Sequence, residues 1–196
     1  MSRFKCYMNN QRLKIAIVIG STRPGRNGEA VSRWVYEMAN SRGDAEYEMV
    51  DIKDYSLPLL DEPIPPSMGQ YSKEHTKIWS AKIDSFDAYV FVTPEYNHGI
   101  PGALKNAIDF LFKEWNNKVA GFVSYGSAGG VRAVEQLRLV MAEVKVATVR
   151  AKCNYLYIRI LKTFQYLNPI IFMRNRLTLL DELVAWADAM KSLRAS

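Results

Sequence analysis

Hydrophobic and polar residues alternate along the chain with two different periods, and the changes between them predict strands and helices. Four short segments rich in β-branched and aromatic residues end at glycine, proline or polar residues, which is typical of buried strands. These segments are residues 13–19, 47–52, 88–92 and 118–124. The segments that follow them repeat apolar residues at spacings of three and four, which predicts amphipathic helices.

Helices are predicted after each of these strands and again near the end of the chain. Two of them are expected at residues 75–86 and 102–112, and the others are recognised by their apolar faces. Those faces consist of Val31, Trp34, Val35 and Met38; of Val134, Leu137, Met141 and Val144; and of Leu180, Leu183, Val184, Ala187 and Met190. Strand and helix therefore alternate from residue 13 to about 150, which indicates a parallel sheet with helices on both faces.

A doubly wound, five-stranded parallel sheet of the flavodoxin-like type, with strand order 2-1-3-4-5, fits this alternation best. A glycine-rich loop of the phosphate-binding kind follows the first strand, and right-handed crossovers leave few other topologies. With 196 residues, of which 48% are hydrophobic and 23% charged, the chain has the composition of one globular domain, residues 1–196.

The sequence carries no sign of secretion, of a membrane span or of a metal cluster. Cys6 and Cys153 lack metal-ligand spacing and form no disulfide framework, which favours a reducing, cytoplasmic location. The first residues lack the apolar core of a signal peptide, and no run of about 18 uncharged apolar residues predicts a membrane helix.

The net charge of +6 comes from one segment of the chain. Between Glu143 and Asp181 there is no acidic residue, while Lys and Arg supply seven positive charges, and removing these seven from +6 leaves −1. A basic protein can bind nucleic acid or anionic membranes. Because the excess is local, we expect neither a nucleic acid nor a membrane as partner of the domain as a whole.

The loop G-S-T-R-P-G-R-N-G at residues 20–28 has the chemistry of an anion site. It combines hydroxyl groups, two guanidinium groups and free backbone N–H groups at the start of a helix. It matches neither the P-loop pattern nor the G-x-G-x-x-G pattern of NAD-binding domains. Taken alone, a glycine turn with surface arginines explains the loop equally well.

A second unusual loop, T-P-E-Y-N-H-G at residues 93–99, follows the strand at 88–92 and supplies aromatic rings and amide groups. Glu95 is a possible general acid or base, but spacing places no second carboxylate or histidine beside it. His98 is one of two histidines, too few for a metal site, and no G-x-S-x-G nucleophile elbow is present. A strand-ending turn before a helix is the structural alternative.

The loop S-Y-G-S-A-G-G at residues 124–130 follows the strand at 118–124. Its backbone N–H groups could bond the edge of a flat heterocycle, because glycine permits close approach. In a doubly wound sheet the loops after the first, third and fourth strands meet at one edge. One loop for phosphate and two for a planar ring favour a mononucleotide with a fused-ring head, and flavin mononucleotide (FMN) fits that description.

Together, the three loops and the helix A-L-K-N-A-I-D-F at residues 103–110 resemble the NADPH-dependent FMN reductase family, which includes azo- and quinone-reducing members. The resemblance covers residues 13 to about 150 and returns at L-D-E-L-V-A-W-A, residues 180–187. It implies a homodimer or homotetramer with the flavin near the subunit interface. It also implies that NADPH or NADH is the electron donor and that a small molecule is the acceptor.

The resemblance assigns site residues to each part of the flavin and leaves catalytic residues unnamed. The phosphate ligands would be Ser21, Arg23, Arg26 and Gly28. The ribityl chain and isoalloxazine ring would lie against Pro94, Glu95, Tyr96, Asn97, Ser124, Gly126, Ser127, Gly129 and Gly130. Tyr96 and His98 would shape the face for nicotinamide and acceptor. The acceptor would be a quinone, an azo compound or free flavin. A non-catalytic, flavodoxin-like electron carrier is the main alternative, and a basic module at residues 145–176 is a third.

Residues 151–178 depart from the family pattern, since they contain no acid and show no clear period. An unusual fifth strand with a loop, or a basic and aromatic surface, would explain them. We favour a pair of compensating frameshifts, because codons permitted for residues 152–169, read two bases later, can encode V-Q-L-S-L-Y-T-D-F-E-N-F-S-I-F-K-P, which resembles the family. Stop codons in that frame of the coding DNA would refute this hypothesis.

Overall fold

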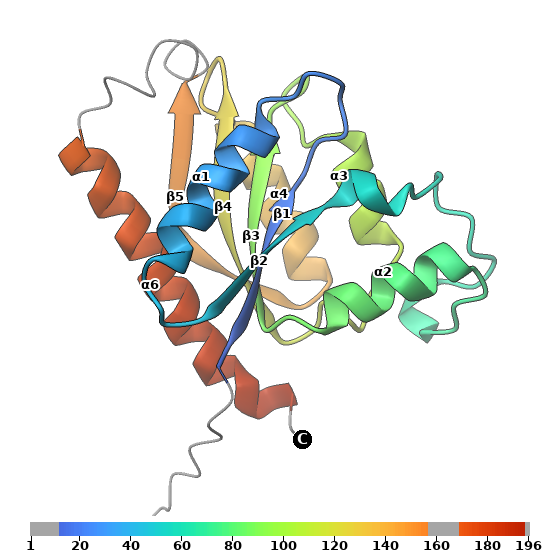
Figure 1. The fold of residues 1–196 in the computed structure, drawn as a ribbon. Coiled ribbons are helices and arrows are strands. Elements are labelled where there is room, and N and C mark those ends of the chain that lie inside the picture. Colours follow the sequence, from blue (N-terminus) through green and yellow to red (C-terminus); the bar gives the residue numbers. More distant parts are fainter. Residues whose placement is uncertain (1–11, 157–168, 195–196) are drawn as a thin grey trace, which may run out of the picture.

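In the computed structural model, which describes residues 12–156 and 169–194, five strands form one parallel sheet in the order β2-β1-β3-β4-β5 (Figure 1). The predicted flavodoxin-like fold and strand order are therefore confirmed. The strands are β1 (Lys14–Ile19), β2 (Glu46–Asp51), β3 (Ala88–Pro94), β4 (Lys118–Gly126) and β5 (Val146–Leu156). The α-helices are α1 (Gly28–Asn40), α2 (Glu74–Asp84), α3 (Gly102–Asp109), α4 (Val131–Glu143) and α6 (Pro169–Arg194), and two 3-10 turns are η1 (Ile52–Tyr55) and η2 (Pro66–Met68).

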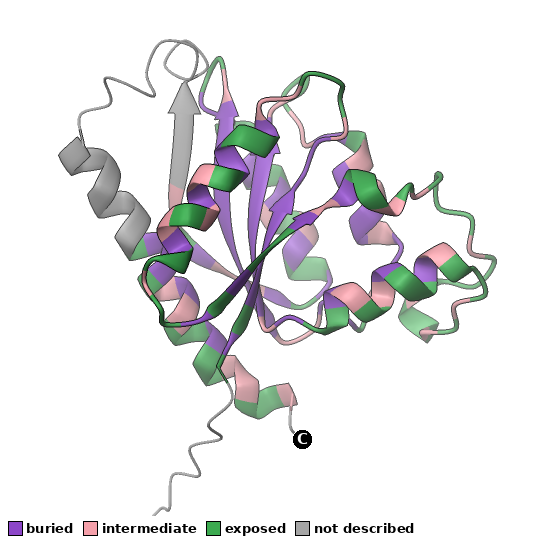
Figure 2. Ribbon diagram, viewed as in Figure 1, coloured by how far each residue is buried: buried purple, intermediate pink, exposed green. Residues whose placement is uncertain are grey.

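Helices cover both faces of the sheet, and each face has its own apolar core. On one face, residues of α2, α3 and α4 pack on Ala16, Val18 and Phe91. On the other face, α1 and α6 pack on the alternate residues, such as Ile15 and Ile17. The central strands are buried along their length (Figure 2). This two-sided burial explains why these strands read as continuous apolar runs rather than alternating ones.

The helix predicted at residues 102–112 ends three residues earlier, at Asp109. The Phe110 amide still donates to the Asn106 carbonyl, but the next turns close with three-residue spacing, including Trp115 N–H to the Phe112 carbonyl at 3.2 Å. The tighter turns bring the Trp115 side chain fully into the core. Apolar spacing alone did not reveal this boundary, because Phe110 and Leu111 stay buried beyond the helix.

The C-terminal part of the sheet is less regular than the rest. Pairing between β4 and β5 steps from Ala120–Thr148 to Phe122–Lys152, so a bulge interrupts β5 where the atypical segment begins. Lys152 is half-buried and pairs with Glu135 of α4 at 2.8 Å. Helix α6 packs on the sheet through Leu180, Leu183 and Ala187, as its apolar spacing predicted. Residues 157–168 of the atypical segment lie outside the described residues.

Candidate functional site

Three loops leave the sheet side by side at the carboxyl ends of β1, β3 and β4. Hydrogen bonds continue past the strands, from Gly20 N–H to the Val92 carbonyl at 2.9 Å and from Glu95 N–H to the Tyr125 carbonyl at 3.2 Å. A cavity of about 150 Å³ lies between the loops. It is lined by Arg23, Arg26, Asn27, Pro94, Glu95, Tyr96, Tyr125, Gly126 and Ser127. All of these except Asn27 and Tyr125 are residues that the sequence singled out.

The two arginines of the first loop play different parts. The Arg26 guanidinium donates to the Ser21 carbonyl at 2.7 Å and pairs with Asp51 at the end of β2, so it holds the loop in shape. Arg23 is exposed and forms no ion pair with any residue that the structure describes. Arg23 therefore keeps an uncompensated positive charge beside the cavity, whereas the charge of Arg26 is largely matched by Asp51.

Helix α1 begins directly after this loop and leaves its first turn open. Its N-cap residue, Asn27, forms no side-chain capping hydrogen bond, and the first helical bond is from Val31 N–H to the Asn27 carbonyl. Uncapped N–H groups and the helix dipole both favour an anion at this end. The start of α1 and Arg23 together provide the donors and the charge that a phosphate group requires.

The second loop forms a tight hairpin at the edge of the cavity. Tyr96 and Gly99 exchange both backbone hydrogen bonds at 3.0 Å, and the two residues between them, Asn97 and His98, have φ values of 50° and 68°. A two-residue turn with positive φ at both positions has the character of type I′, and asparagine and histidine tolerate it better than most residues. The Tyr96 hydroxyl shares a hydrogen bond of 2.9 Å with Ser21 Oγ, which joins this loop to the first.

The Glu95 side chain fastens the second loop to helix α4. Its carboxylate accepts the backbone N–H of Arg132 at 3.0 Å and the Arg132 guanidinium at 2.9 Å, so it caps the start of α4. Burial works to raise the pKa of Glu95, but the hydrogen bonds from Arg132 and from the Ala133 N–H outweigh it and lower that pKa. A carboxylate held ionised by these donors is poorly suited to act as a general acid.

The third loop is closed by its own hydrogen bonds. Ser124 Oγ donates to the Gly129 carbonyl at 2.7 Å, and Gly129 N–H donates to the Gly126 carbonyl at 3.1 Å. Gly129 and Gly130 have φ values of 74° and 73°, and a β-carbon at Gly130 would lie 2.7 Å from the Ser124 β-carbon. Only glycine fits at Gly130, because the position is both left-handed and tightly packed.

Besides Asn27, two residues that the sequence did not single out belong to the site. Tyr125 lies between the predicted site residues Ser124 and Gly126, but its sequence context is that of an apolar strand. Its position at the carboxyl end of that strand is the signal that could have identified it as a site residue. Gln136 of α4 accepts the Ile100 N–H at 2.8 Å through Oε1 and so supports the second loop from below. No sequence signal links Gln136 to that loop, because the contact depends on how α4 packs.

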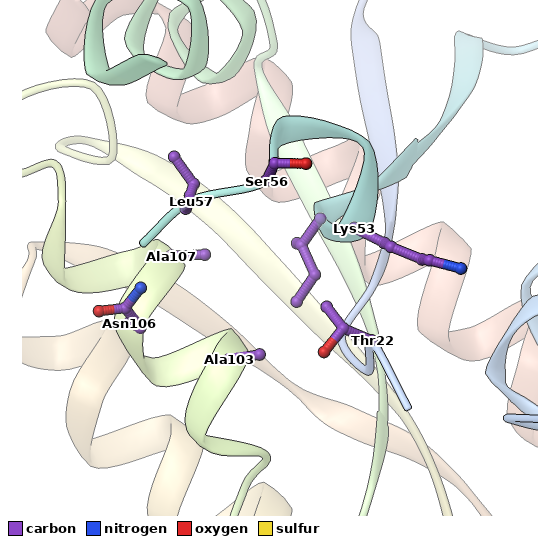
Figure 3. Close-up of a pocket in the computed structure, with 8 residues that line it drawn as sticks. Thr22, Lys53, Ser56, Leu57, Ala103, Asn106 and Ala107 are labelled. Carbon is purple, nitrogen blue, oxygen red and sulfur yellow. The ribbon is translucent and has the colours of Figure 1, made fainter. Parts of the chain in front are cut away.

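A second pocket, of about 300 Å³, lies on the other side of the first loop (Figure 3). It is formed by Thr22, by four residues in and just after η1, and by three of α3: Ile52, Lys53, Ser56, Leu57, Ala103, Asn106 and Ala107. Asn106 fixes the adjoining loop through hydrogen bonds with Leu60 N–H and the Pro58 carbonyl. None of the predicted site residues lines this pocket.

Two further properties concern metals and membranes. Within residues 12–156 and 169–194, no three His, Cys, Asp or Glu side chains are grouped so that they could hold a metal ion. Among the described helices, none combines the length and the apolar content that a bilayer span requires.

Comparison with known proteins identifies the family of this chain. The family model described as NADPH-dependent FMN reductase matches residues 13–156, which contain all three loops. The chain belongs to this family. The membership confirms the resemblance seen in the sequence and supports FMN and NAD(P)H as cofactors. The match ends inside the segment that departs from the family pattern.

Individual relatives agree with this assignment. The chain is 46% identical over 147 residues to the NAD(P)H-dependent FMN reductase ntnL of a Nectria species, covering 70% of this chain and 73% of that protein. It is 35% identical over 136 residues to a quinone reductase of Pseudomonas putida, with 66% and 69% covered. The structure of FerB, an NAD(P)H:acceptor oxidoreductase from Paracoccus denitrificans, has the same fold, with a TM-score of 0.72 at 19% identity and 91% and 98% of the two chains covered.

The residues present fit an FMN phosphate. The start of α1 offers unpaired N–H groups, Arg23 offers a free positive charge, and both adjoin the cavity between the loops. The cavity is too small for a whole flavin, so the ring would lie on the open side of the second and third loops, where Tyr96 is partly exposed.

Proposed function

We propose that this protein is an FMN-dependent NAD(P)H oxidoreductase that passes electrons to a quinone, an azo compound or free flavin. The observation that carries the proposal is the meeting of three chemically distinct loops around one cavity, with an open helix start and a free arginine at one end. The quinone reductases among the relatives favour a quinone as acceptor. The domain would span residues 1–196 and act in the cytoplasm as a homodimer or homotetramer.

In this proposal each loop has a separate task. Ser21, Arg23, Arg26 and Gly28 form the phosphate end, where Arg23 supplies the counter-charge and Arg26 shapes the loop through Asp51. The ribityl chain and ring would lie against residues 94–97 and 124–130. When bound, FMN supplies the redox chemistry that links a hydride donor to an electron acceptor, and the protein supplies orientation and electrostatics.

The nicotinamide and the acceptor would meet the protein at the hairpin that carries Tyr96 and His98. The hairpin lies at the open edge of the site and is held by the Tyr96–Gly99 pairing. Glu95, the carboxylate nearest to it in sequence, is engaged by Arg132. Because the flavin would carry the reactive chemistry, the reaction needs no protein general acid or base, and the residues of this chain would act by binding and positioning.

Replacing Arg23 tests the phosphate end. Arg23→Ala should leave the fold intact and weaken FMN binding about tenfold, the size expected for one hydrogen-bonded charge pair with a phosphate. Apo-protein titrated with FMN, followed by flavin fluorescence, measures the change. Arg33→Ala is a matched control, because Arg33 also carries a positive charge near the start of the chain's first helix, α1, but does not line the cavity. Its guanidinium lies 3.7 Å from the Glu29 carboxylate. Unchanged FMN affinity in Arg23→Ala would count against the assignment.

The colour of the holoprotein separates the enzyme from the alternatives. Anaerobic NADPH should bleach the flavin absorbance, and adding a quinone should restore it. A yellow protein that does not bleach would support a flavodoxin-like electron carrier. A protein that binds no flavin would favour the basic module, although the described part of that segment includes Lys152, whose charge is already paired with Glu135.

A further inference from the structure

The hydroxyl group of Tyr125 lies at the start of helix α1, beside the proposed phosphate position. Tyr125 is the penultimate residue of β4, and its ring belongs to the apolar core that α1 covers. The residue is only 4% exposed, yet it lines the cavity between the three loops. The ring is thus anchored in the core, and the hydroxyl end reaches the cavity at the first turn of α1.

Gly28, the first residue of α1, makes room for this hydroxyl. A β-carbon at Gly28 would lie 2.8 Å from the Tyr125 hydroxyl oxygen, but 3.5 Å from the nearest Ile19 atom and 3.8 Å from the Tyr125 ring carbon that bears the hydroxyl. Gly28 does not have a positive φ, so its backbone conformation is open to other residues. The small size of Gly28 therefore matters chiefly because of the Tyr125 hydroxyl.

The Tyr125 hydroxyl has no hydrogen-bond partner among the residues that the structure describes. Polar atoms of largely buried side chains almost always have a hydrogen-bond partner, in the protein or outside it. The oxygen itself is not among the fully buried, unpaired side-chain atoms of the described residues, which are Ser32 Oγ and Thr76 Oγ1, so it is open to the cavity that Tyr125 lines. An unpaired hydroxyl that opens into a cavity between charged loops is placed to bond a ligand atom.

The surrounding charges indicate what kind of atom this is. Burial raises the pKa of Tyr125, the neighbouring Tyr96 raises it further, and the guanidinium groups of Arg23 and Arg26 act in the opposite direction. The hydroxyl stays protonated at neutral pH and is available as a donor. A donor hydroxyl, two guanidinium groups and open helical N–H groups all favour an anionic acceptor.

We propose that the Tyr125 hydroxyl donates a hydrogen bond to the phosphate of FMN at the start of α1. This inference rests on the proposed function and deepens it, because it makes Tyr125 a residue that distinguishes FMN from riboflavin, which lacks the phosphate. Gly28 is the matching element, since it leaves the space through which the hydroxyl reaches the helix.

The test compares the two flavins in one variant. Apo-protein of the parent and of Tyr125→Phe is titrated with FMN and with riboflavin, and flavin fluorescence gives each dissociation constant. We expect FMN affinity to fall about tenfold, as for the loss of one hydrogen bond to a charged group, while riboflavin affinity stays unchanged. Tyr36→Phe is the matched control, because Tyr36 is a half-buried tyrosine of α1 outside the cavity and should leave both affinities as they are.

The outcomes separate this inference from the proposed function. Equal losses for both flavins would place the hydroxyl on the ribityl chain or on the fold, and an unchanged FMN affinity would remove it from the site, so either result overturns the inference alone. A parent protein that binds neither flavin would overturn the proposed function and this inference with it.

Gly28→Ala provides an independent check of the geometry. The added methyl group would displace the Tyr125 hydroxyl, so this variant should lose FMN affinity to a similar extent. In the double variant with Tyr125→Phe the crowded oxygen is gone, and the two losses should not add. Additive losses would mean that Gly28 and Tyr125 act separately, which would contradict the pairing.

Discussion

The two sides of the candidate site are built differently. On the ring side, the second loop is tied to the third by Glu95 N–H and the Tyr125 carbonyl. It is tied to α4 through Glu95 with Arg132 and through Ile100 with Gln136. On the phosphate side, the first loop is held by Arg26 with Asp51 and by the bond from Ser21 to Tyr96, while its Arg23 side chain and the first N–H groups of α1 are left open.

This difference separates two requirements of a flavin site. A flat ring is bound by shape, so its wall gains from being rigid before the ligand arrives. A phosphate is bound by hydrogen bonds and charge, so its donors must be unpaired in the free protein. Hydrogen bonds within the ring wall are therefore expected to contribute to stability, whereas the open groups of the first loop are expected to contribute to binding.

The largest effect is expected at Gly130, in the ring wall. Gly130→Ala would force a left-handed alanine within 2.7 Å of the Ser124 β-carbon. Backbone strain and overpacking together should destabilise the fold by about 3 kcal/mol, or about 10 °C in Tm for a domain of this size. Thermal unfolding measures it. Gly102→Ala is the control, because nothing lies near its β-carbon position, and a similar Tm in both variants would contradict the packing argument.

A smaller effect is expected at Glu95. Glu95→Gln keeps the shape of the side chain but loses the ionised cap of α4 and the pair with Arg132. The variant should lose about 1–2 kcal/mol at pH 7. Urea unfolding measures the loss, and Glu143→Gln at the exposed end of α4 should change the unfolding free energy little. A loss no larger than that of the control would show that the cap is not stabilising.

The effect of Glu95→Gln on the unfolding free energy should also depend on pH. Because the folded protein lowers the pKa of Glu95, its contribution to stability is fully present above the pKa of an unfolded glutamate, about 4.3. That contribution is lost as the pH falls through the lower pKa of the folded state. The difference in unfolding free energy between parent and Glu95→Gln should therefore shrink below about pH 4. A difference that stays constant with pH would show that the carboxylate charge is not responsible.

The sequence predicted the fold and the loops, but not how the loops hold one another. The strands were predictable because helices on both faces make them continuously apolar, and the predicted β2 differs from the observed strand by one residue at each end. The glycines of the three loops indicated where the chain could approach a ligand closely. Glu95 appeared as a candidate ligand, whereas its partner Arg132 lies on a different element. Such a pair is set by packing, which no local spacing reports.

Tyr125 and Arg26 show two ways in which local sequence misjudges a site residue: it missed Tyr125, and it did not show that Arg26 is paired. Tyr125 was overlooked because a buried tyrosine in an apolar strand looks like any core residue until α1 is placed over it. Arg26 was predicted as a phosphate ligand on the strength of its loop, but its partner Asp51 comes from β2, 25 residues away. Charge in a sequence shows what a residue could bind, and only the fold shows which groups are already paired.

The smallest effect is expected for the bond between the two sides, from Ser21 Oγ to the Tyr96 hydroxyl. Tyr96→Phe and Ser21→Ala should each lower the unfolding free energy by about 1 kcal/mol, and the double variant should lose little more than either one, because both remove the same bond. Urea unfolding of the four proteins gives the coupling. Hydrogen exchange should rise in residues 20–28 of both single variants and remain unchanged around Gln136. Additive losses would mean that the bond does not join the two sides, and the pair of Arg26 with Asp51 would then be the main side-chain contact that holds the phosphate loop.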